Sequence, residues 1–170
     1  MWKAERTENN PQIVFDILKK HKLLPDSMPH CAAACNALGS GGERFSLESD
    51  GELMAEVFVS GVVPHESASM DIIPVTKHFR FGYHEAFIEA MSPIFDDLFN
   101  EFDVRRVSAA IPASRSRTKK ALCVLGFKIE GRIREAIKLH NENPQDMRML
   151  GLLKSDYVAE SDTEETSDGS

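Results

Sequence analysis

Apolar side chains recur at helical spacing in two stretches of the chain. Residues 13–24 place apolar positions three and four apart and end before Pro25, which predicts a helix. Residues 83–102 are longer, and the Phe, Met, Ile and Leu side chains on one face predict the main amphipathic helix. Ser92-Pro93 lies inside this stretch, so either the helix kinks or two helices meet there.

Two shorter helices are predicted by composition and glycine stops. Residues 31–38 are rich in alanine and are followed by Gly39, and residues 118–125 are followed by Gly126. Cys31 and Cys35 lie in the first of these helices, with His30 beside them. A small apolar helix face is favoured over a zinc site there, and we predict no metal.

Alternating and continuous apolar runs predict the strands. Asp50-Gly51 is typical of a hairpin turn, and Glu142-Asn143-Pro144 predicts a second turn. Pro74 cannot donate to a ladder and therefore favours an edge position. The predicted strands are residues 45–48, 53–64, 70–75, 105–112, 127–140 and 145–157. Their order among the helices predicts a mixed α/β fold around a mostly antiparallel sheet.

Composition adds limits to this picture. The chain has 170 residues, of which 42% are hydrophobic and 28% charged, which suits one globular domain over residues 1–158. It has no apolar run long enough to span a bilayer, no signal-peptide pattern at Met1, and only three cysteines. We therefore expect a cytoplasmic protein that does not contact membranes.

The net charge of −7 is concentrated at the C-terminus. Residues 159–170 contain five carboxylates and no Lys or Arg, which predicts a disordered acidic tail. Such a tail either keeps the protein soluble, or contacts a basic partner or competes for a basic site.

Cations gather where the strand ending at Pro112 passes into the next helix. Arg115, Arg117, Lys119 and Lys120 surround the predicted helix start, where backbone N–H groups already favour an anion. A phosphate-bearing ligand is predicted here, and a solvated helix face or a nucleic-acid patch is the alternative. No aromatic residues alternate with these cations, which argues against nucleic acid.

The segment from this helix onward resembles a known superfamily. Leu125-Gly126-Phe127 followed by Glu130-Gly131, in this order of elements, is similar to the Gcn5-related N-acetyltransferases. The resemblance implies a twisted, mostly antiparallel sheet flanked by helices. It also implies a V-shaped splay between the fourth and fifth strands, at about residues 70–75 and 106–112, which admits the pantetheine arm of acyl-CoA.

The resemblance also implies a cofactor, acetyl-CoA, and residues that bind it. Lys77, Arg80 and Gly82 occupy the loop that holds the pyrophosphate in the superfamily, with Arg80 in place of a glycine. Arg115 and Lys119 would hold the remaining phosphate. The predicted cofactor-binding set is completed by Ile73, Val75 and Thr118.

The implied chemistry is attack of a neutral amine on a thioester, which needs a base for the amine proton. Candidate bases on or beside the central strands are Glu56, His65, Glu66 and Asp71. The superfamily often has a Tyr that acts as the general acid four residues before the glycine of Leu-Gly-Phe. Here that position is Leu122, which cannot donate a proton.

Two functions follow from the resemblance. The first is acetyl transfer from acetyl-CoA to an amine that the sequence does not identify. The alternative is a catalytically degenerate phage protein that acts in the virion, in head assembly or in other protein binding. Arg80 and Leu122 favour the alternative, and the retained basic helix start favours the enzyme. A homo-oligomer is compatible with both, through an exposed edge near Tyr157.

Overall fold

The computed structural model describes residues 1–77, 79 and 84–157. Within these residues the strands are β1 (Trp2–Thr7), β2 (Glu43–Ser49), β3 (Glu52–Val63), β4 (Ser67–Pro74), β5 (Arg106–Pro112), β6 (Lys128–Ile137) and β7 (Gln145–Leu153). The helices are α1 (Pro11–Lys20), α2 (Met28–Gly39), α3 (His84–Asp96), the π-helical turn η2 (Asp97–Glu101) and α4 (Ser116–Val124). The strands form one sheet in the order β1-β2-β3-β4-β5-β7-β6, which confirms the predicted fold class.

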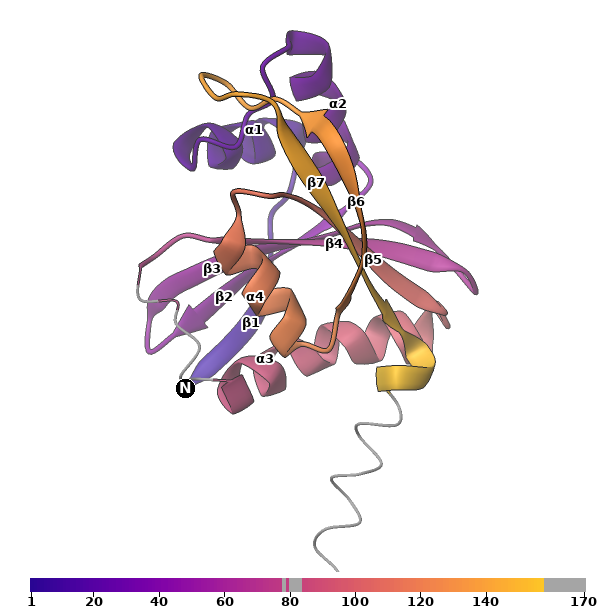
Figure 1. The fold of residues 1–170 in the computed structure, drawn as a ribbon. Helices are drawn as coiled ribbons and strands as arrows, with labels where there is room; N and C mark the ends of the chain where they lie inside the picture. The colour runs from indigo at the N-terminus through magenta and orange to yellow at the C-terminus, as the bar shows by residue number, and fades with distance from the viewer. Residues whose placement is uncertain (78, 80–83, 158–170) are drawn as a thin grey trace, which may run out of the picture.

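Helices cover both faces of the β1–β4 part of the sheet. Helices α1 and α2 lie on one face and α3 lies on the other (Figure 1). A small core of Val14, Leu18, Cys35, Phe58 and Ile73 joins the sheet to α1 and α2. A larger core joins the sheet to α3 and α4, and the fully buried Ile72 belongs to it. Neighbouring residues of β4 thus serve opposite cores, as strand alternation requires.

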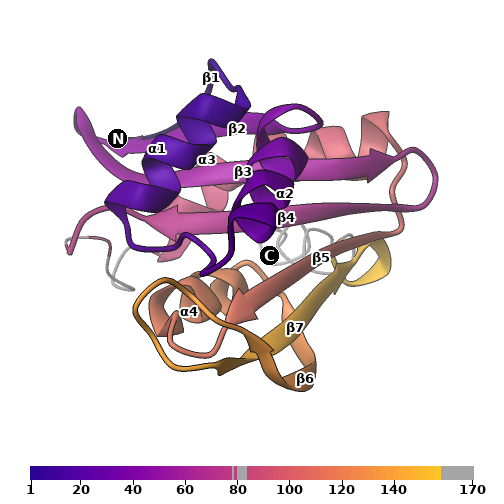
Figure 2. The same ribbon diagram turned by 90° about the horizontal axis from the view of Figure 1, so that it is seen from above.

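The sheet is antiparallel except where β4 meets β5. These two strands pair in parallel only over Ser67–Ser69 and Arg106–Ser108. Beyond that point β4 continues with β3 alone, and β5 continues with β7 alone. Figure 2 shows the two strands starting side by side and then diverging, with α4 beside the gap. The predicted splay and its two strands are therefore confirmed.

The splay explains why proline is tolerated at Pro74, inside the sheet. The residue ends an interior strand, although proline favours sheet edges. At this end of β4 the strand has lost its β5 partner, so the missing N–H breaks no ladder bond between these two strands.

The N-terminal strand was not predicted from the sequence. β1 pairs with β2 along its whole length, from Trp2 with Ser49 to Thr7 with Arg44. The Trp2 ring packs against the rings of Phe79 and Phe87, which anchors β1 to the larger core. The following helix begins at Pro11, where Asn10 caps it by accepting a hydrogen bond from the backbone N–H of Ile13.

Two predictions for the later part of the chain are corrected. Strand β7 ends at Leu153, and residues 154–157 are helical, so the predicted strand over 145–157 is too long. Tyr157 lies in this helical turn and packs against Phe95 and Phe99, so among the described residues it does not lie at a sheet edge as expected. Pro93 lies inside α3 without splitting it.

In the part of the chain that the structure describes, no helix is long and apolar enough to cross a membrane.

Candidate active site at the splay between β4 and β5

The backbone edge of β4 in the splay already has hydrogen-bond donors against it. The carbonyl oxygen of Ile72 accepts from Nη2 of Arg115 at 2.8 Å and from Oγ1 of Thr118 at 2.9 Å. Both donors come from the start of α4, 40 or more residues further along the chain. Two side chains thus take the place that a neighbouring strand would occupy.

Arg115 also forms an ion pair with Asp71 in the splay. Its two terminal nitrogens lie 3.2 and 3.4 Å from the two carboxylate oxygens of Asp71. The same guanidinium donates to Oγ1 of Thr118 at 3.1 Å. The pair is shielded from water, with 12% of the Arg115 side chain and 22% of the Asp71 side chain exposed. Such shielding makes the attraction less sensitive to salt than that of a surface pair.

Arg117 ties α4 to the segment that follows β4. It donates to the backbone carbonyls of Thr76 and Phe79. Phe79 is itself buried, in edge contact with Phe87, so the described part of this segment is held at Phe79. Lys77 lies in between and is exposed. Arg80 and Gly82, the other predicted pyrophosphate ligands of this loop, lie outside the described residues.

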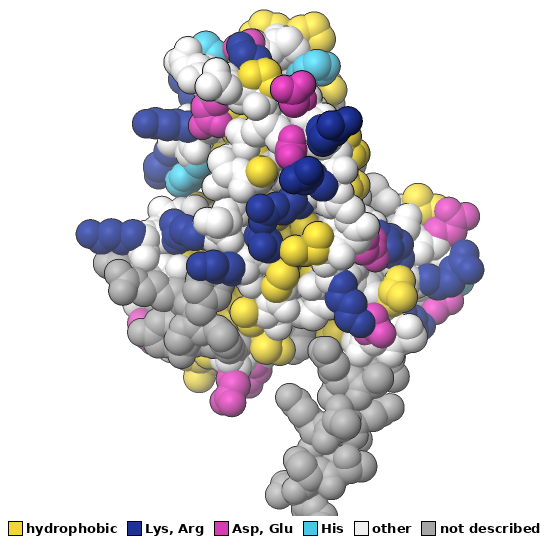
Figure 3. All heavy atoms as spheres, in the orientation of Figure 1, with side chains coloured by type: hydrophobic (Ala, Val, Ile, Leu, Met, Phe, Trp, Pro, Cys, Tyr) yellow, Lys and Arg dark blue, Asp and Glu magenta, His cyan; other side chains and the backbone are white. Residues whose placement is uncertain are grey.

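The four cations at the start of α4 therefore have different surroundings. Arg115 and Arg117 turn toward β4 and the segment after it. Lys119 is half-buried and forms no ion pair with any described residue, while Lys120 is exposed. Strand β6 contributes Lys128 and Arg132 to the chain's cations. Lys and Arg side chains gather on the face of the molecule that Figure 3 shows. This face is basic, although the chain as a whole is acidic.

A cavity of about 260 Å³ opens where β4 and β5 begin to separate. Leu38 of α2 and Met149 of β7 contribute apolar walls. The polar residues that line it are Asp71, Ser60, Ser69 and Ser108. The cavity is small and partly polar, and its one carboxylate, Asp71, is paired with Arg115.

The four candidate bases do not come together. Asp71 lies in the splay and lines this cavity. Glu56 lies on β3, is 4% exposed, and receives two hydrogen bonds from Arg44, each of 2.9 Å. His65 and Glu66 lie in the β3–β4 turn, at the end of β4 that pairs with β5 rather than at the open end. Geometry therefore favours Asp71 among the four.

No described tyrosine is placed to donate a proton in the splay. Leu122, at the position where the superfamily often has Tyr, is fully buried in the larger core. The hydroxyl of Tyr157 donates to Asp96 at 3.0 Å, on the side of the molecule that carries α3. Burial, and then the hydrogen bond to Asp96, raise the pKa of Tyr157 to about 12.

The alternation of β4 separates Ile72 from the two strand residues that the sequence analysis selected. The Ile73 side chain is in the small core, and Ile73 is cross-strand partner of Glu56. The Val75 backbone N–H donates to Met54 of β3. Ile72, whose carbonyl faces the splay, was not selected, because nothing in the sequence tells which way a strand's carbonyls point.

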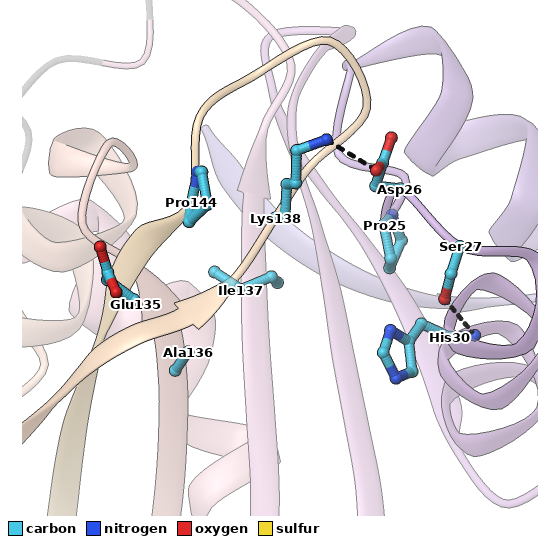
Figure 4. Close-up of a pocket in the computed structure, with 9 residues that line it drawn as sticks. All are labelled: Pro25, Asp26, Ser27, His30, Glu135, Ala136, Ile137, Lys138 and Pro144. Carbon is cyan, nitrogen blue, oxygen red and sulfur yellow. Dashed lines mark hydrogen bonds and ion pairs between the residues drawn. The ribbon is translucent and has the colours of Figure 1, made fainter.

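A larger cavity, of about 530 Å³, lies between the α1–α2 loop and the β6–β7 hairpin. Lys138 Nζ lies 2.7 Å from a carboxylate oxygen of Asp26 (Figure 4). The backbone N–H of Asp26 donates to Lys138, and that of His140 donates to Leu24. We call these contacts the loop clasp. Glu135 and His30 line the same cavity.

Cys31, Cys35 and His30 contribute to the local fold of α2. Cys31 and Cys35 are buried, and the Cys31 thiol donates to the carbonyl of Pro25. The backbone N–H of His30 donates to Oγ of Ser27, which caps α2. Among the described residues no group of three or more His, Cys, Asp and Glu could hold a metal ion.

Comparison with solved structures identifies the class of this fold. The splayed sheet, with α4 against it, is the fold of the Gcn5-related N-acetyltransferases. One similar structure is spermidine N-acetyltransferase from Vibrio cholerae in complex with CoA and spermine. It has 16% sequence identity and a TM-score of 0.65, over 92% of this chain and 98% of that one.

A second similar structure is the dodecameric form of the Vibrio cholerae enzyme in an intermediate state. It has 17% identity and a TM-score of 0.64, over 94% of this chain and 98% of that one. No protein-family model and no curated protein matches the sequence. The comparisons give no support to the phage alternative.

Proposed function

We propose that this protein is an acyl-CoA-dependent N-acyltransferase, which moves an acetyl group from acetyl-CoA to an amine. The observation that carries the proposal is the splay itself, where β4 offers a backbone edge without a strand partner, next to the basic start of α4. The similar structures named above are N-acetyltransferases, and one of them was solved with CoA.

The residues at the splay fit acetyl-CoA in two respects. The amide groups of a pantetheine arm could hydrogen-bond along β4 as an added strand would, since the β5 partner is absent there. Lys77 and Lys119, together with the predicted Arg80 and Gly82, would contact phosphate groups. The Ile72 carbonyl, however, is held by Arg115 and Thr118 in this conformation.

Acetyl-CoA would supply an activated thioester, and the protein would supply a proton acceptor. Asp71 is the best-placed candidate for taking the amine proton, directly or through water, because it lines the cavity at the splay. A strong proton donor for the leaving group is not required, since a thiol has a pKa near 8.5 and its thiolate leaves readily. The absence of Tyr at Leu122 is compatible with this chemistry.

The acceptor class is an amine, and polyamines are the first compounds to screen. Spermidine and spermine come from the names of the similar structures, and Asp71 would attract a cationic amine once it is released from Arg115. A homo-oligomer is also proposed, by analogy with the dodecameric neighbour.

Calorimetric titration with acetyl-CoA, followed by a thiol-release assay with spermidine and other amines, tests the proposal. We expect saturable binding and acceptor-dependent release of CoA thiol. The Asp71→Asn variant should lose roughly 100-fold or more in kcat, because removal of a general base costs about that much. Glu89→Gln, an exposed carboxylate change on α3, is the matched control. If neither the wild type nor the Arg115→Ala variant binds millimolar acetyl-CoA, the proposal is wrong.

A further inference from the structure

The splay contains a charged side chain of the protein's own. Arg115 reaches Asp71, the carbonyl of Ile72 and the hydroxyl of Thr118, and all three partners lie within 3.4 Å. Its guanidinium is largely shielded from solvent by these contacts. Arg115 lies at the N-cap of α4, where it makes no side-chain cap to the helix itself. The side chain therefore bridges β4 and Thr118 in the first turn of α4.

The same backbone group is needed by any ligand that adds to β4. A buried carbonyl must have a donor, and here Arg115 and Thr118 provide it. A ligand amide that hydrogen-bonds to Ile72 as an added strand has to displace the Arg115 donor from its 2.8 Å contact. Displacement also breaks the ion pair with Asp71, because one guanidinium makes both contacts.

We propose that Arg115 is a latch on the splay, and that acyl-CoA binds only after Arg115 leaves Asp71 and Ile72. This inference rests on the proposed function and adds a means of regulating the same site. A protein whose binding-competent state is a minor fraction binds with an affinity reduced by that fraction. The latch thus weakens the apparent affinity for acyl-CoA while it protects the β4 edge from other partners.

The opposite role makes the opposite prediction. If Arg115 instead contacts the cofactor phosphates, its removal weakens binding. If it closes the splay, its removal strengthens binding. The direction of the change in Kd therefore separates the two roles.

The test measures the Kd of acetyl-CoA by calorimetry for the full chain and a set of variants. Arg115→Ala and Asp71→Asn each remove one side of the latch and should each lower Kd by on the order of tenfold, as for a site that is about one-tenth open. The double variant should bind no tighter than Arg115→Ala, because that change already removes both the ion pair with Asp71 and the contact with the Ile72 carbonyl. Arg115→Lys keeps a positive charge but loses the paired N–H groups of the guanidinium. Its Kd should lie between those of the wild type and Arg115→Ala.

Arg132→Ala is the matched control for loss of one positive charge. Arg132 pairs with Asp146 on the exposed β6–β7 hairpin, and 63% of its side chain is exposed. Its removal should leave Kd within about twofold of wild type, because an exposed pair contributes little. Thermal unfolding of each variant checks that it is folded. If Arg115→Ala does not fold, the Kd of Asp71→Asn provides the test of the latch.

Each outcome decides between the hypotheses. If both single variants bind acetyl-CoA more tightly than the wild type, the latch is supported. If the variants bind and the wild type does not, the latch is supported and is almost always closed. If the wild type binds and neither variant binds more tightly, the latch is wrong and the proposed function survives. If no form binds acetyl-CoA, both are wrong.

Discussion

The two parts of the sheet, on either side of the splay, are built in different ways. In the β1–β4 part, β3 is buried continuously from Met54 to Ser60, because helices cover both of its faces. In the β5–β7–β6 part, β6 is exposed at almost every position, and Ile129 and Ile133 are each about half exposed. We call the β1–β4 part the platform, because it is packed on both faces, and the exposed β6–β7 hairpin the ribbon.

This difference indicates which side of the splay is fixed. The edge of β4 belongs to the platform, where Ile72 and Ile73 enter opposite cores. Strand β5 is held mainly by the larger core and by its pairing with β7. Regions with fewer buried contacts open at lower free-energy cost. We therefore expect any change in the width of the splay to come from the β5–β7–β6 part, against a constant β4.

The largest contrast should come from apolar side chains in the two parts. Phe58→Ala removes a fully buried ring from the small core and should lower the free energy of unfolding by about 3–5 kcal/mol. Ile133→Ala, on β6, removes a side chain that is 52% exposed and should cost under about 1 kcal/mol. Urea unfolding measures both values. Equal losses would contradict the distinction between platform and ribbon.

Ion pairs should show the same contrast at a smaller scale. Glu56→Ala leaves the Arg44 guanidinium without its carboxylate in a site where the two side chains are 5% and 17% exposed. Loss of one partner of a buried pair costs about 3 kcal/mol.

Glu130→Ala is the comparison variant in the other part of the sheet. Its pair with Arg106 is more exposed, at 36% for both side chains, and its loss should cost under about 1 kcal/mol. The same unfolding series measures both changes, and a larger loss for Glu130 than for Glu56 would reverse our interpretation.

Alkaline pH should weaken the contact that joins the end of β7 to α3. Burial and the hydrogen bond to Asp96 raise the pKa of Tyr157 from its ordinary value of 10 to about 12. The contribution to stability is complete below pH 10 and is lost as the pH rises from 10 toward 12.

Tyr157→Phe keeps the ring between Phe95 and Phe99 and removes the ionisable hydroxyl. Its unfolding midpoint should decline less steeply over that pH range than the wild-type midpoint. Parallel curves for the two proteins would show that Tyr157 does not carry the effect.

Acidic pH should give the smallest effect, at the contact between the β7 end and the segment before β5. The hydrogen bond from Lys154, with a further one from His65, lowers the pKa of Asp103 from 3.8 to about 2. This contribution is present above pH 3.8 and is lost as the pH falls toward 2.

Asp103→Asn should flatten the acid limb of the stability curve only slightly, because Asp103 is exposed to solvent. Asparagine also tolerates the positive φ of 53° at this position, so the backbone should not change. A large change in the acid limb would mean that Asp103 has a role beyond this surface contact.

Local sequence signals were sufficient for most of the platform, whereas the splay was implied by the resemblance to the acetyltransferases. The hairpin at Asp50-Gly51 and the glycine after α4 fix where elements turn, and both were found where predicted. Strand β1 was missed because it lies at the sheet edge and alternates charged residues with few apolar ones. Tyr157 was wrongly assigned to a strand. Its position depends on packing against Phe99, which is distant in the sequence, and no local pattern reveals that contact.

The site was less predictable, for a physical reason. Asp71 and Arg115 were both selected from the sequence, but for separate roles. Their ion pair joins residues 44 positions apart and depends on how far β4 and β5 diverge. No local pattern encodes that separation. The direction of the Ile72 carbonyl is likewise a property of the folded strand, whatever its side chain.

The loop clasp between Asp26 and Lys138 has a consequence for the order of folding. The two residues are 112 positions apart, so the contact closes a long loop of chain. Closing such a loop in the unfolded chain is entropically costly, whereas after the sheet has formed the two loops already lie close together. The clasp therefore forms late, and local opening at this end should precede global unfolding. Amide hydrogens of Asp26 and His140 should then exchange with solvent earlier than those of β3, and the cavity beside the loop clasp becomes accessible while the rest of the sheet stays folded.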